Sequence, residues 1–513
     1  MAITGAFAPT GTRRIRWYNY VAYGANDIFG GGSMAVISSW VLIFYTTFCG
    51  LAAWQAGLIF TIARVLDAIN SPLIGHISDS MGATWIGRRF GRRRFFILAA
   101  IPLLPSFAIM WVAGLGFWYY LVTYVLFELV YAMEIIPYET LAAEMAKDYQ
   151  KKATFAGVRI LFSHLSAILA GFLPAMLINA LGKNSPKTFL YMGIIFAILF
   201  IITATLLFLF SWERPPGEVA ALRPAGEAKP SIAQAFKALY RNLFSTFRIR
   251  AFRLHLGMYL GGYISQDIFN AAFTFFIVFA LAGSITVAST MIGWLYAVQF
   301  VAVGITIAVV LRAPPASAYR FAAATFAVGV IVLLLMWNAG VRSGNLLLWV
   351  PIIFAGLGRG ALNYIPWATY NYMADVDEVV TGQRREGAFA GVMTFTRKVT
   401  QALAISGVGV IMSVGGFDSK AKVQSPQAID TIAAVLGIGT LAMLLFGILV
   451  SLRFRLDRRT HAILMDEIDR FKTDPDKAPL DETRSIVEDL SGWPHDKLWG
   501  RNPVLAAGMM QPH

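Results

Sequence analysis

Long apolar segments alternate with short polar loops along nearly the whole chain. A helix needs about 20 apolar residues to cross the hydrocarbon core of a membrane. Twelve segments meet this requirement, which predicts an all-α membrane protein with twelve transmembrane helices. The predicted helices cover residues 19–48, 53–77, 95–113, 117–144, 153–180, 188–212, 252–282, 287–312, 319–339, 346–374, 387–414 and 428–453.

A polar linker with several prolines divides these segments into two groups of six. We predict an N-terminal six-helix bundle at residues 1–212, a cytosolic linker at 213–250 and a C-terminal bundle at 251–454. The charged residues 455–513 follow as a cytosolic tail, which we expect to form short helices in the cytosol or at the membrane surface.

The composition excludes a soluble globular protein, since 57% of the 513 residues are hydrophobic and the mean hydropathy is +0.61. The net charge of +14 does not indicate nucleic-acid binding, because the basic residues lie between apolar segments and face lipid headgroups. The single Cys49 rules out an intramolecular disulfide framework.

Basic residues concentrate in alternate loops, among them the cluster Arg88–Arg94 and the pair Arg384 and Arg385. The loops on the opposite side contain few basic residues, such as Lys187 and Arg342. Cytosolic loops carry an excess of arginine and lysine. The pattern therefore predicts a multi-pass protein of a bacterial inner membrane with both termini in the cytosol.

Three short patterns occur once in each half of the chain, in the same order and at similar offsets. Because six helices separate the copies, both copies have the same orientation in the membrane. The halves are thus predicted to be parallel repeats related by an axis along the membrane normal, as in two-bundle transporters. The patterns are YGANDIF at 23–29 and YISQDIF at 263–269, IPY at 136–138 and IPW at 365–367, and FAGV at 155–158 and 389–392.

Several ionisable residues lie inside the predicted helices, where an unpaired charge is costly. We expect them to face a shared wet cavity or one another, and we expect some of them to contact the substrate. The alternative is internal pairing that holds helices together. The residues are Asp27, Asp67, Glu134, Glu139, Arg159, Asp267 and Lys398.

Asp67, Asn70 and Ser71 are spaced so that they share one face of a helix. Their carboxylate, amide and hydroxyl oxygens could coordinate Na⁺, or Asp67 could carry a proton. This trio is the predicted site of a coupling cation. The alternative is a structural pair between Asp67 and Arg64.

Gly75, Asp79, Arg92 and Arg93 lie at the predicted cytosolic end of the second helix and in the loop after it. Gly75 permits close helix approach. Asp79 can pair with an arginine or with a helix N-terminus of the other bundle. We predict that these residues form a gate that holds the cytosolic side shut; the alternative is a pure topology signal.

The aromatic residues Tyr138 and Trp367 are predicted near the middle of the membrane, where they could stack on sugar rings. Most other aromatic residues suit the membrane interface. The sequence contains no metal-ligand spacing, nucleophile elbow or phosphate-binding loop. We therefore expect neither an enzyme nor a cofactor.

Several motifs make the chain similar to the glycoside–pentoside–hexuronide:cation symporters, the major-facilitator branch that contains melibiose permease. They are YGANDIFGG, ARVLDAINSP, GHISD with GRRFGRRRFF, IIPY, YMADVDEVVTGQRREGAFAG and TFTRK with the charged tail. The resemblance covers nearly the whole chain. It implies a monomeric major-facilitator transporter that imports a sugar with H⁺ or Na⁺.

The resemblance also assigns roles to individual residues. Asp27 and Arg159 match sugar-binding positions of the family, Lys398 matches the lysine of the eleventh helix, and Asp67 and Asn70 match the cation site. A second acid of the sodium-using members is replaced here by Ser71, which favours H⁺ over Na⁺.

The sugar-binding acid of the fourth helix aligns with Ile135, which leaves Glu134 and Glu139 as competing candidates. The segments GGGSMAVISSWVLIFYTTFCGL and GRRFGRRRFF resemble the oligogalacturonide and rhamnogalacturonide transporters. Arg159, Lys398 and Arg397 would suit uronate carboxylates, so the imported sugar is expected to be a glycoside or a uronate-containing oligosaccharide. A lysolipid-type carrier or an exporter of the same fold is the alternative.

Overall fold

The protein is described by a computed structural model. Within the described part, the regular secondary structure is helical, apart from one backbone bridge between Phe7 and Glu213. This confirms the predicted all-α class. The described residues are 6–9, 12–81, 84–146, 149–181, 187–215, 244–310, 313–370, 372–382, 385–421, 423–474 and 477–501.

The helices of the first half begin and end close to the predicted positions, and several are broken by short π-helical or 3₁₀ turns, labelled η. They are α1 (Trp17–Ala25), α2 (Asp27–Val36), η1 (Ile37–Val41), η2 (Phe44–Phe48), α3 (Ala53–Ser80), α4 (Trp85–Phe90), α5 (Arg94–Ala100), η4 (Ile101–Leu103), α6 (Ser106–Ile109), α7 (Phe117–Met145), α8 (Tyr149–Leu181) and α9 (Lys187–Phe210).

The second half follows the same plan and ends in a helical tail. Its elements are α12 (Arg250–Phe275), η5 (Phe276–Ala280), α13 (Ile285–Val310), α14 (Pro315–Asn338), η6 (Leu346–Leu348), α15 (Trp349–Tyr370), α16 (Met373–Thr381), α17 (Glu386–Val414), α18 (Pro426–Ala434), η7 (Val435–Gly439), α19 (Thr440–Ser451), α20 (Arg458–Thr473), α21 (Asp481–Ser491) and η8 (His495–Lys497).

Eight helical stretches of the described chain are long and apolar enough to cross a membrane. They correspond to the fourth to tenth and the twelfth predicted helices. The first predicted helix is broken into α1, α2 and two π turns, and the third is the shorter apolar stretch Arg94–Ile109. Helices α3 and α17 are also long enough, and both carry charged residues in their middle, Arg64 and Asp67 in α3 and Arg397 and Lys398 in α17.

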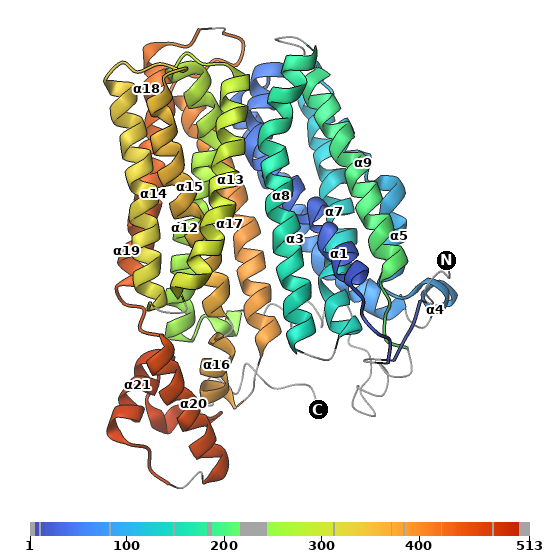
Figure 1. The fold of residues 1–513 in the computed structure, drawn as a ribbon, viewed down its shortest axis with the longest axis vertical. Helices are drawn as coiled ribbons and strands as arrows, with labels where there is room; N and C mark the ends of the chain where they lie inside the picture. The colour runs from blue at the N-terminus through green and yellow to red at the C-terminus, as the bar shows by residue number, and fades with distance from the viewer. Residues whose placement is uncertain are drawn as a thin grey trace.

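The two halves lie side by side as two upright bundles, and α20 and α21 lie below the C-terminal bundle (Figure 1). We call the end of the bundles nearest α20 and α21 the tail end, and the opposite end the far end. At the tail end, α20 contacts α16 through a hydrogen bond between His461 Nε2 and Asp375 Oδ2 at 2.8 Å and an ion pair between Lys472 and Glu378 at 2.6 Å. The predicted tail helices therefore dock on the C-terminal bundle.

The bundles touch through small residues in the far half of the molecule. A Cβ atom on Gly171 of α8 would lie 2.4 Å from the Cα atom of Gly293 of α13, and one on Gly57 of α3 would lie 2.8 Å from the Cα atom of Ser406 of α17. Small residues at helix interfaces let backbones approach this closely. The contacts hold the far end of the bundles together.

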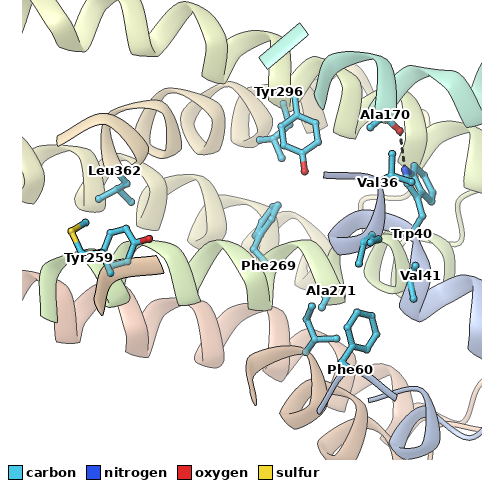
Figure 2. Close-up of a cluster of buried hydrophobic side chains, with 14 of the residues drawn as sticks. Val36, Trp40, Val41, Phe60, Ala170, Tyr259, Phe269, Ala271, Tyr296 and Leu362 are labelled. Atoms are coloured by element: carbon cyan, nitrogen blue, oxygen red, sulfur yellow. Dashed lines mark hydrogen bonds between the residues drawn. The ribbon is translucent and has the colours of Figure 1, made fainter. Parts of the chain in front are cut away.

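Aromatic side chains continue this contact toward the centre of the molecule. The Ser39 hydroxyl of η1 lies 3.1 Å from the Tyr296 hydroxyl of α13 and joins the two bundles. Figure 2 shows Tyr296 and Phe269 in the same buried cluster as Trp40, whose indole N–H donates to the carbonyl of Ala170 at 2.9 Å. The far end is therefore closed by packing as well as by hydrogen bonds.

We expect Gly171→Trp to open the far end. Overpacking costs about 1–3 kcal/mol, which reduces the population of the closed state by roughly tenfold. In a Cys49→Ser background, a cysteine placed at the buried Ser39 reports this opening through its rate of alkylation by a membrane-impermeant maleimide. The rate should rise in the Gly171→Trp variant, and an unchanged rate would contradict far-end closure by this contact.

Candidate functional site

Arg159 of α8 joins two acidic groups of the N-terminal bundle. Its Nε donates to Asp27 of α2 at 2.8 Å, and one terminal nitrogen donates to Glu139 of α7 at 3.2 Å. The guanidinium lies 5.2 Å from the ring centroid of Tyr138. Asp27 is buried, whereas the side chains of Arg159 and Glu139 are 31% and 44% exposed. These residues form an open-sided polar group, which we call the Arg159 cluster.

Lys398 of α17 reaches across to the other bundle. Its Nζ lies 2.8 Å from Oδ2 of Asp67 on α3 and 3.5 Å from the Ser71 hydroxyl, which itself donates to Oδ1 of Asp67 at 2.9 Å. Asp67 is 1% exposed and Lys398 24% exposed. Asn70 is half-buried on the same helix. One ion pair therefore ties the predicted cation site to the opposite bundle.

Tyr131 of α7 lies between these two groups. Its ring centroid is 5.8 Å from the Lys398 ammonium, and its hydroxyl donates to the carbonyl of Gly30 at 3.4 Å. Gly30 in turn lies against Asp27, because a Cβ atom at Gly30 would be 2.7 Å from Oδ1 of Asp27. The residues predicted for the substrate and for the cation are thus neighbours across one aromatic ring.

The C-terminal bundle contains a matching pair. Arg397 binds both carboxylate oxygens of Asp267, at 2.6 and 2.8 Å, and stacks 4.8 Å from the ring centroid of Tyr263. The indole of Trp367 donates to the Tyr263 hydroxyl at 3.1 Å. Through Tyr263, Trp367 is therefore linked to Arg397, the residue before Lys398. In the N-terminal bundle, Tyr138 lies directly against Arg159.

Arg64 does not form the structural pair with Asp67 that the sequence left open. It binds Glu128 of α7 at 3.2 Å, and both side chains are buried. Glu128 was not among the candidate residues. A lone acid inside an apolar helix was the available signal, but the sequence shows no partner for it close by.

The two acids that compete for the substrate role lie in different surroundings. Glu134 is fully buried and accepts a hydrogen bond of 2.5 Å from Asn26 Nδ2, at the junction of α1 and α2. Glu139 reaches Arg159 and is partly exposed. The structure thus brings Glu139, but not Glu134, into the Arg159 cluster.

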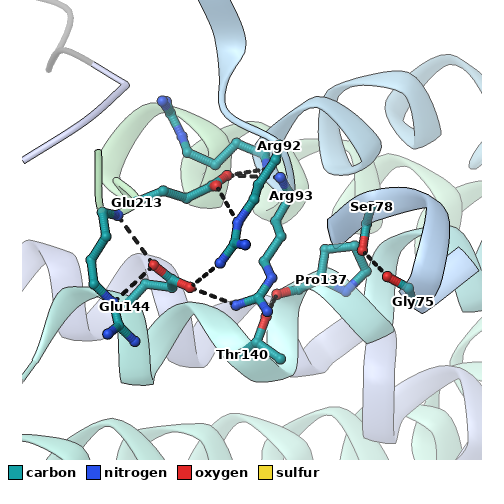
Figure 3. A network of polar contacts seen from close by, with 10 residues as sticks. Gly75, Ser78, Arg92, Arg93, Pro137, Thr140, Glu144 and Glu213 are labelled. Atoms are coloured by element: carbon teal, nitrogen blue, oxygen red, sulfur yellow. Dashed lines mark hydrogen bonds and ion pairs between the residues drawn. The ribbon is translucent and has the colours of Figure 1, made fainter. Parts of the chain in front are cut away.

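Two of the four residues predicted as a gate, Arg92 and Arg93, form a charge network with Glu144 and Glu213 (Figure 3). Arg92 and Arg93 bind Glu144 at the end of α7, at 2.8 and 2.7 Å. The backbone N–H groups of Arg93 and Arg94 donate to Glu213 at 2.9 and 2.7 Å. We call Arg92, Arg93, Glu144, Glu213 and Arg214 the loop clamp.

The loop clamp holds its two acids in different ways. Burial disfavours the charged form of Glu144, but Arg93, Arg92 and Arg214 outweigh it and lower the pKa of Glu144. Burial raises the pKa of Glu213, although two backbone N–H groups oppose the shift. Glu144 belongs to the same bundle as Arg92 and Arg93, and Glu213 follows the last helix of that bundle at the start of the predicted linker. The described contacts of Arg92 and Arg93 therefore fasten the loop to its own bundle.

The other two predicted gate residues lie on α3. A Cβ atom at Gly75 would lie 3.9 Å from Ile136 of α7, so this glycine adjoins a neighbouring helix of its own bundle. The side chain of Asp79 lies outside the described part of the structure. Its predicted role in a gate stays a prediction.

We expect Glu144→Ala to destabilise the protein by about 3–5 kcal/mol, because it leaves three arginines without their shared acid. The lowered pKa means that this contribution is present at neutral pH and is lost as the pH falls below the ordinary range of a glutamate. Thermal unfolding in detergent measures the change. The matched control is Glu482→Ala, since an exposed pair contributes about 0–1 kcal/mol; equal effects of both changes would contradict the clamp.

The chain is similar in sequence to known membrane transporters. The chain is 25% identical to the "Glucuronide carrier protein homolog" of Escherichia coli over 90% of this chain and 97% of that protein. It is 23% identical to the "Isoprimeverose transporter" of Lactiplantibacillus pentosus, over 82% and 84% of the two chains. Both matches extend through the two bundles.

Solved structures share the fold. A bacterial homologue of the human lysosomal transporter Spinster has a TM-score of 0.58 and 14% identity, covering 87% of this chain and all of that one. A D-xylose–proton symporter has a TM-score of 0.54 and 14% identity, covering 83% and 96%. The family model described as "MFS/sugar transport protein" matches residues 22–458. The chain therefore belongs to this major-facilitator sugar transport family and is a multi-pass membrane transporter, not an enzyme.

Proposed function

We propose that this protein imports a uronate-containing glycoside or oligosaccharide together with a proton. The ion pair between Asp67 and Lys398 is the observation that carries this proposal. It joins the two bundles at 2.8 Å through a buried carboxylate. A proton on Asp67 removes the charge that holds Lys398, so ion binding changes a contact between the two moving halves. Ser71 adds a neutral hydroxyl instead of a second acid, which favours H⁺ over Na⁺.

The substrate class rests on the cations of the same region. Arg159, Arg397 and Lys398 are partly exposed, and planar guanidinium groups bind carboxylates with two hydrogen bonds. Trp367 is 38% exposed and adds an aromatic face for a sugar ring, whereas Tyr138 is fully buried and contacts Arg159 instead. A relative is a glucuronide carrier homologue, and a glucuronide carries a carboxylate. An acidic sugar, as in the oligogalacturonide branch, is therefore the proposed cargo.

The proposed orientation in the membrane and the conformation rest on which end is closed and on where the basic residues lie. The described inter-bundle contacts of Gly57, Gly171 and Ser39 lie in the far half. The excess of basic residues at the tail end supports a cytosolic location for this end, for both termini and for the linker at 213–250. In this assignment the protein faces inward, with the Arg159 cluster turned toward the cytosol.

Proteoliposomes test the proposal. The purified protein is reconstituted, and uptake of a labelled uronate disaccharide and of its neutral counterpart is measured under an inward H⁺ gradient, an inward Na⁺ gradient or no gradient. We expect H⁺-driven accumulation of the uronate. Accumulation driven by Na⁺ alone would overturn proton coupling, and preference for the neutral sugar would overturn the substrate class. Flipping of lysolipids without any sugar uptake would instead support a lipid carrier.

A further inference from the structure

Glu128 and Arg64 form a second buried ion pair beside the pair of Asp67 and Lys398. Arg64 and Asp67 are three residues apart on α3, so their side chains are neighbours on one face of the helix. Both members of the Arg64–Glu128 pair are at most 4% exposed. The region thus holds two acids and two cations, contributed by α3, α7 and α17.

The charges around Glu128 belong to this group. Glu128 experiences the field of Arg64 and Asp67 on α3, of Lys398 on α17 and of the Tyr124 hydroxyl on its own helix. A buried ion pair contributes little net stability compared with apolar residues of the same volume. Packing alone therefore does not account for an acid at this position. Two carboxylates near each other repel, and a single proton on either one relieves the repulsion.

Arg64 connects the charge of Glu128 to the opposite bundle. One terminal nitrogen faces Glu128 at 3.2 Å, and the other lies 3.5 Å from Oε1 of Gln401 on α17 and 3.3 Å from Sδ of Met34 on α2. A neutral Glu128 holds Arg64 less tightly, and the guanidinium then shifts toward Gln401. The protonation state of Glu128 thereby changes the contact of Arg64 with Gln401 of the other bundle. In the same way, the protonation state of Asp67 changes its contact with Lys398.

We propose that Glu128 is a second binding site for the coupling proton, acting with Asp67 across α3. The proton binds one carboxylate oxygen, releases the facing cation and leaves from either acid when the cytosolic side is open. Glu128 from α7 then supplies the second acid that α3 lacks at Ser71. This inference rests on the proposed proton-coupled transport and adds a residue that the sequence analysis did not select.

Glu128→Gln tests the role of this acid. Proton-driven accumulation in proteoliposomes should fall by about tenfold or more, which lies within the usual range of coupling effects. Counterflow of labelled against unlabelled substrate needs no net proton movement, so we expect it to persist. Glu128→Asp keeps an acid and should restore part of the accumulation. Undiminished accumulation by Glu128→Gln would overturn the proposal.

The double variant Arg64→Gln/Glu128→Gln separates proton binding from a structural ion pair. It removes both charges of the pair, so neither is left buried without its partner, and it replaces Glu128→Gln if that variant alone fails to fold. A merely structural pair predicts recovery of accumulation in the double variant, and this result would overturn the proposal. We expect counterflow without accumulation. If the unmodified protein itself shows no proton-driven uptake, the proposed function fails before Glu128 is tested.

Discussion

Asp67→Asn is expected to abolish proton-driven accumulation while leaving downhill exchange of substrate intact. Asparagine has nearly the same shape as aspartate but binds no proton and carries no charge for Lys398. A carrier without a coupling ion only equilibrates its substrate, so the accumulation ratio should fall to about one. The measurement is uptake of the labelled uronate into proteoliposomes under an inward H⁺ gradient, paired with counterflow in the same preparation.

The matched control is Asp418→Asn, which neutralises an exposed acid in the far-end loop between α17 and α18. Its uptake should equal that of the unmodified protein, because a solvent-exposed carboxylate far from the Asp67–Lys398 pair holds no buried cation. Accumulation that survives in Asp67→Asn would show that the proton is carried elsewhere. In that case the ion pair between the bundles would be a structural contact.

The sequence predicted the helices well because hydropathy is a local property. Each predicted span overlaps helical residues of the structure, including α3 and α17, whose central charges lower their apolar character. The breaks within the first helix were missed. Asn26 separates α1 from α2 there and binds Glu134, a contact across 108 positions of sequence. Such an interruption depends on a partner that local periodicity does not reveal.

The partners of the buried charges were the least predictable feature. Arg64 lies one turn from Asp67, and the sequence therefore offered Asp67 as its partner. The structure pairs Arg64 with Glu128 instead, 64 positions away. Helix-face arguments fix which residues of one helix are neighbours, but only tertiary packing fixes which helices meet. For the same reason, the sequence did not decide whether Arg92 and Arg93 form a gate or only mark the cytosolic side of the membrane.

The pairing of Asp67 with Lys398 shows what the repeats and motifs did supply. The resemblance assigned both residues to transport, and the structure brings them together at 2.8 Å from helices 331 positions apart. Asp27 and Arg159 meet in the same way. The roles implied by the family resemblance therefore predicted these long-range contacts better than the spacing of residues along a single helix did.

Arg159→Ala is expected to weaken uronate binding by about 100-fold or more. The change removes the cation proposed to bind the substrate and leaves Asp27 buried without its ion-pair partner. Truncating one member of such a pair costs about 2–5 kcal/mol. The uronate affinity of Arg159→Lys should lie between those of the unmodified protein and Arg159→Ala. An ammonium group keeps the charge but does not reproduce the planar fork that reaches Asp27 and Glu139 together. Calorimetric titration of the protein in lipid nanodiscs measures the affinities.

Two comparisons make this expectation specific to a carboxylate. Arg342→Ala removes an exposed arginine of the far-end loop, whose described side-chain bond goes to the carbonyl of Val341, and should leave the affinity unchanged. The uronate should lose more affinity than its neutral counterpart in Arg159→Ala, since only the uronate pairs its charge with the guanidinium. Equal losses for both sugars would mean that Arg159 acts by holding Asp27 in place for sugar hydroxyls, and the cargo would then be a neutral glycoside.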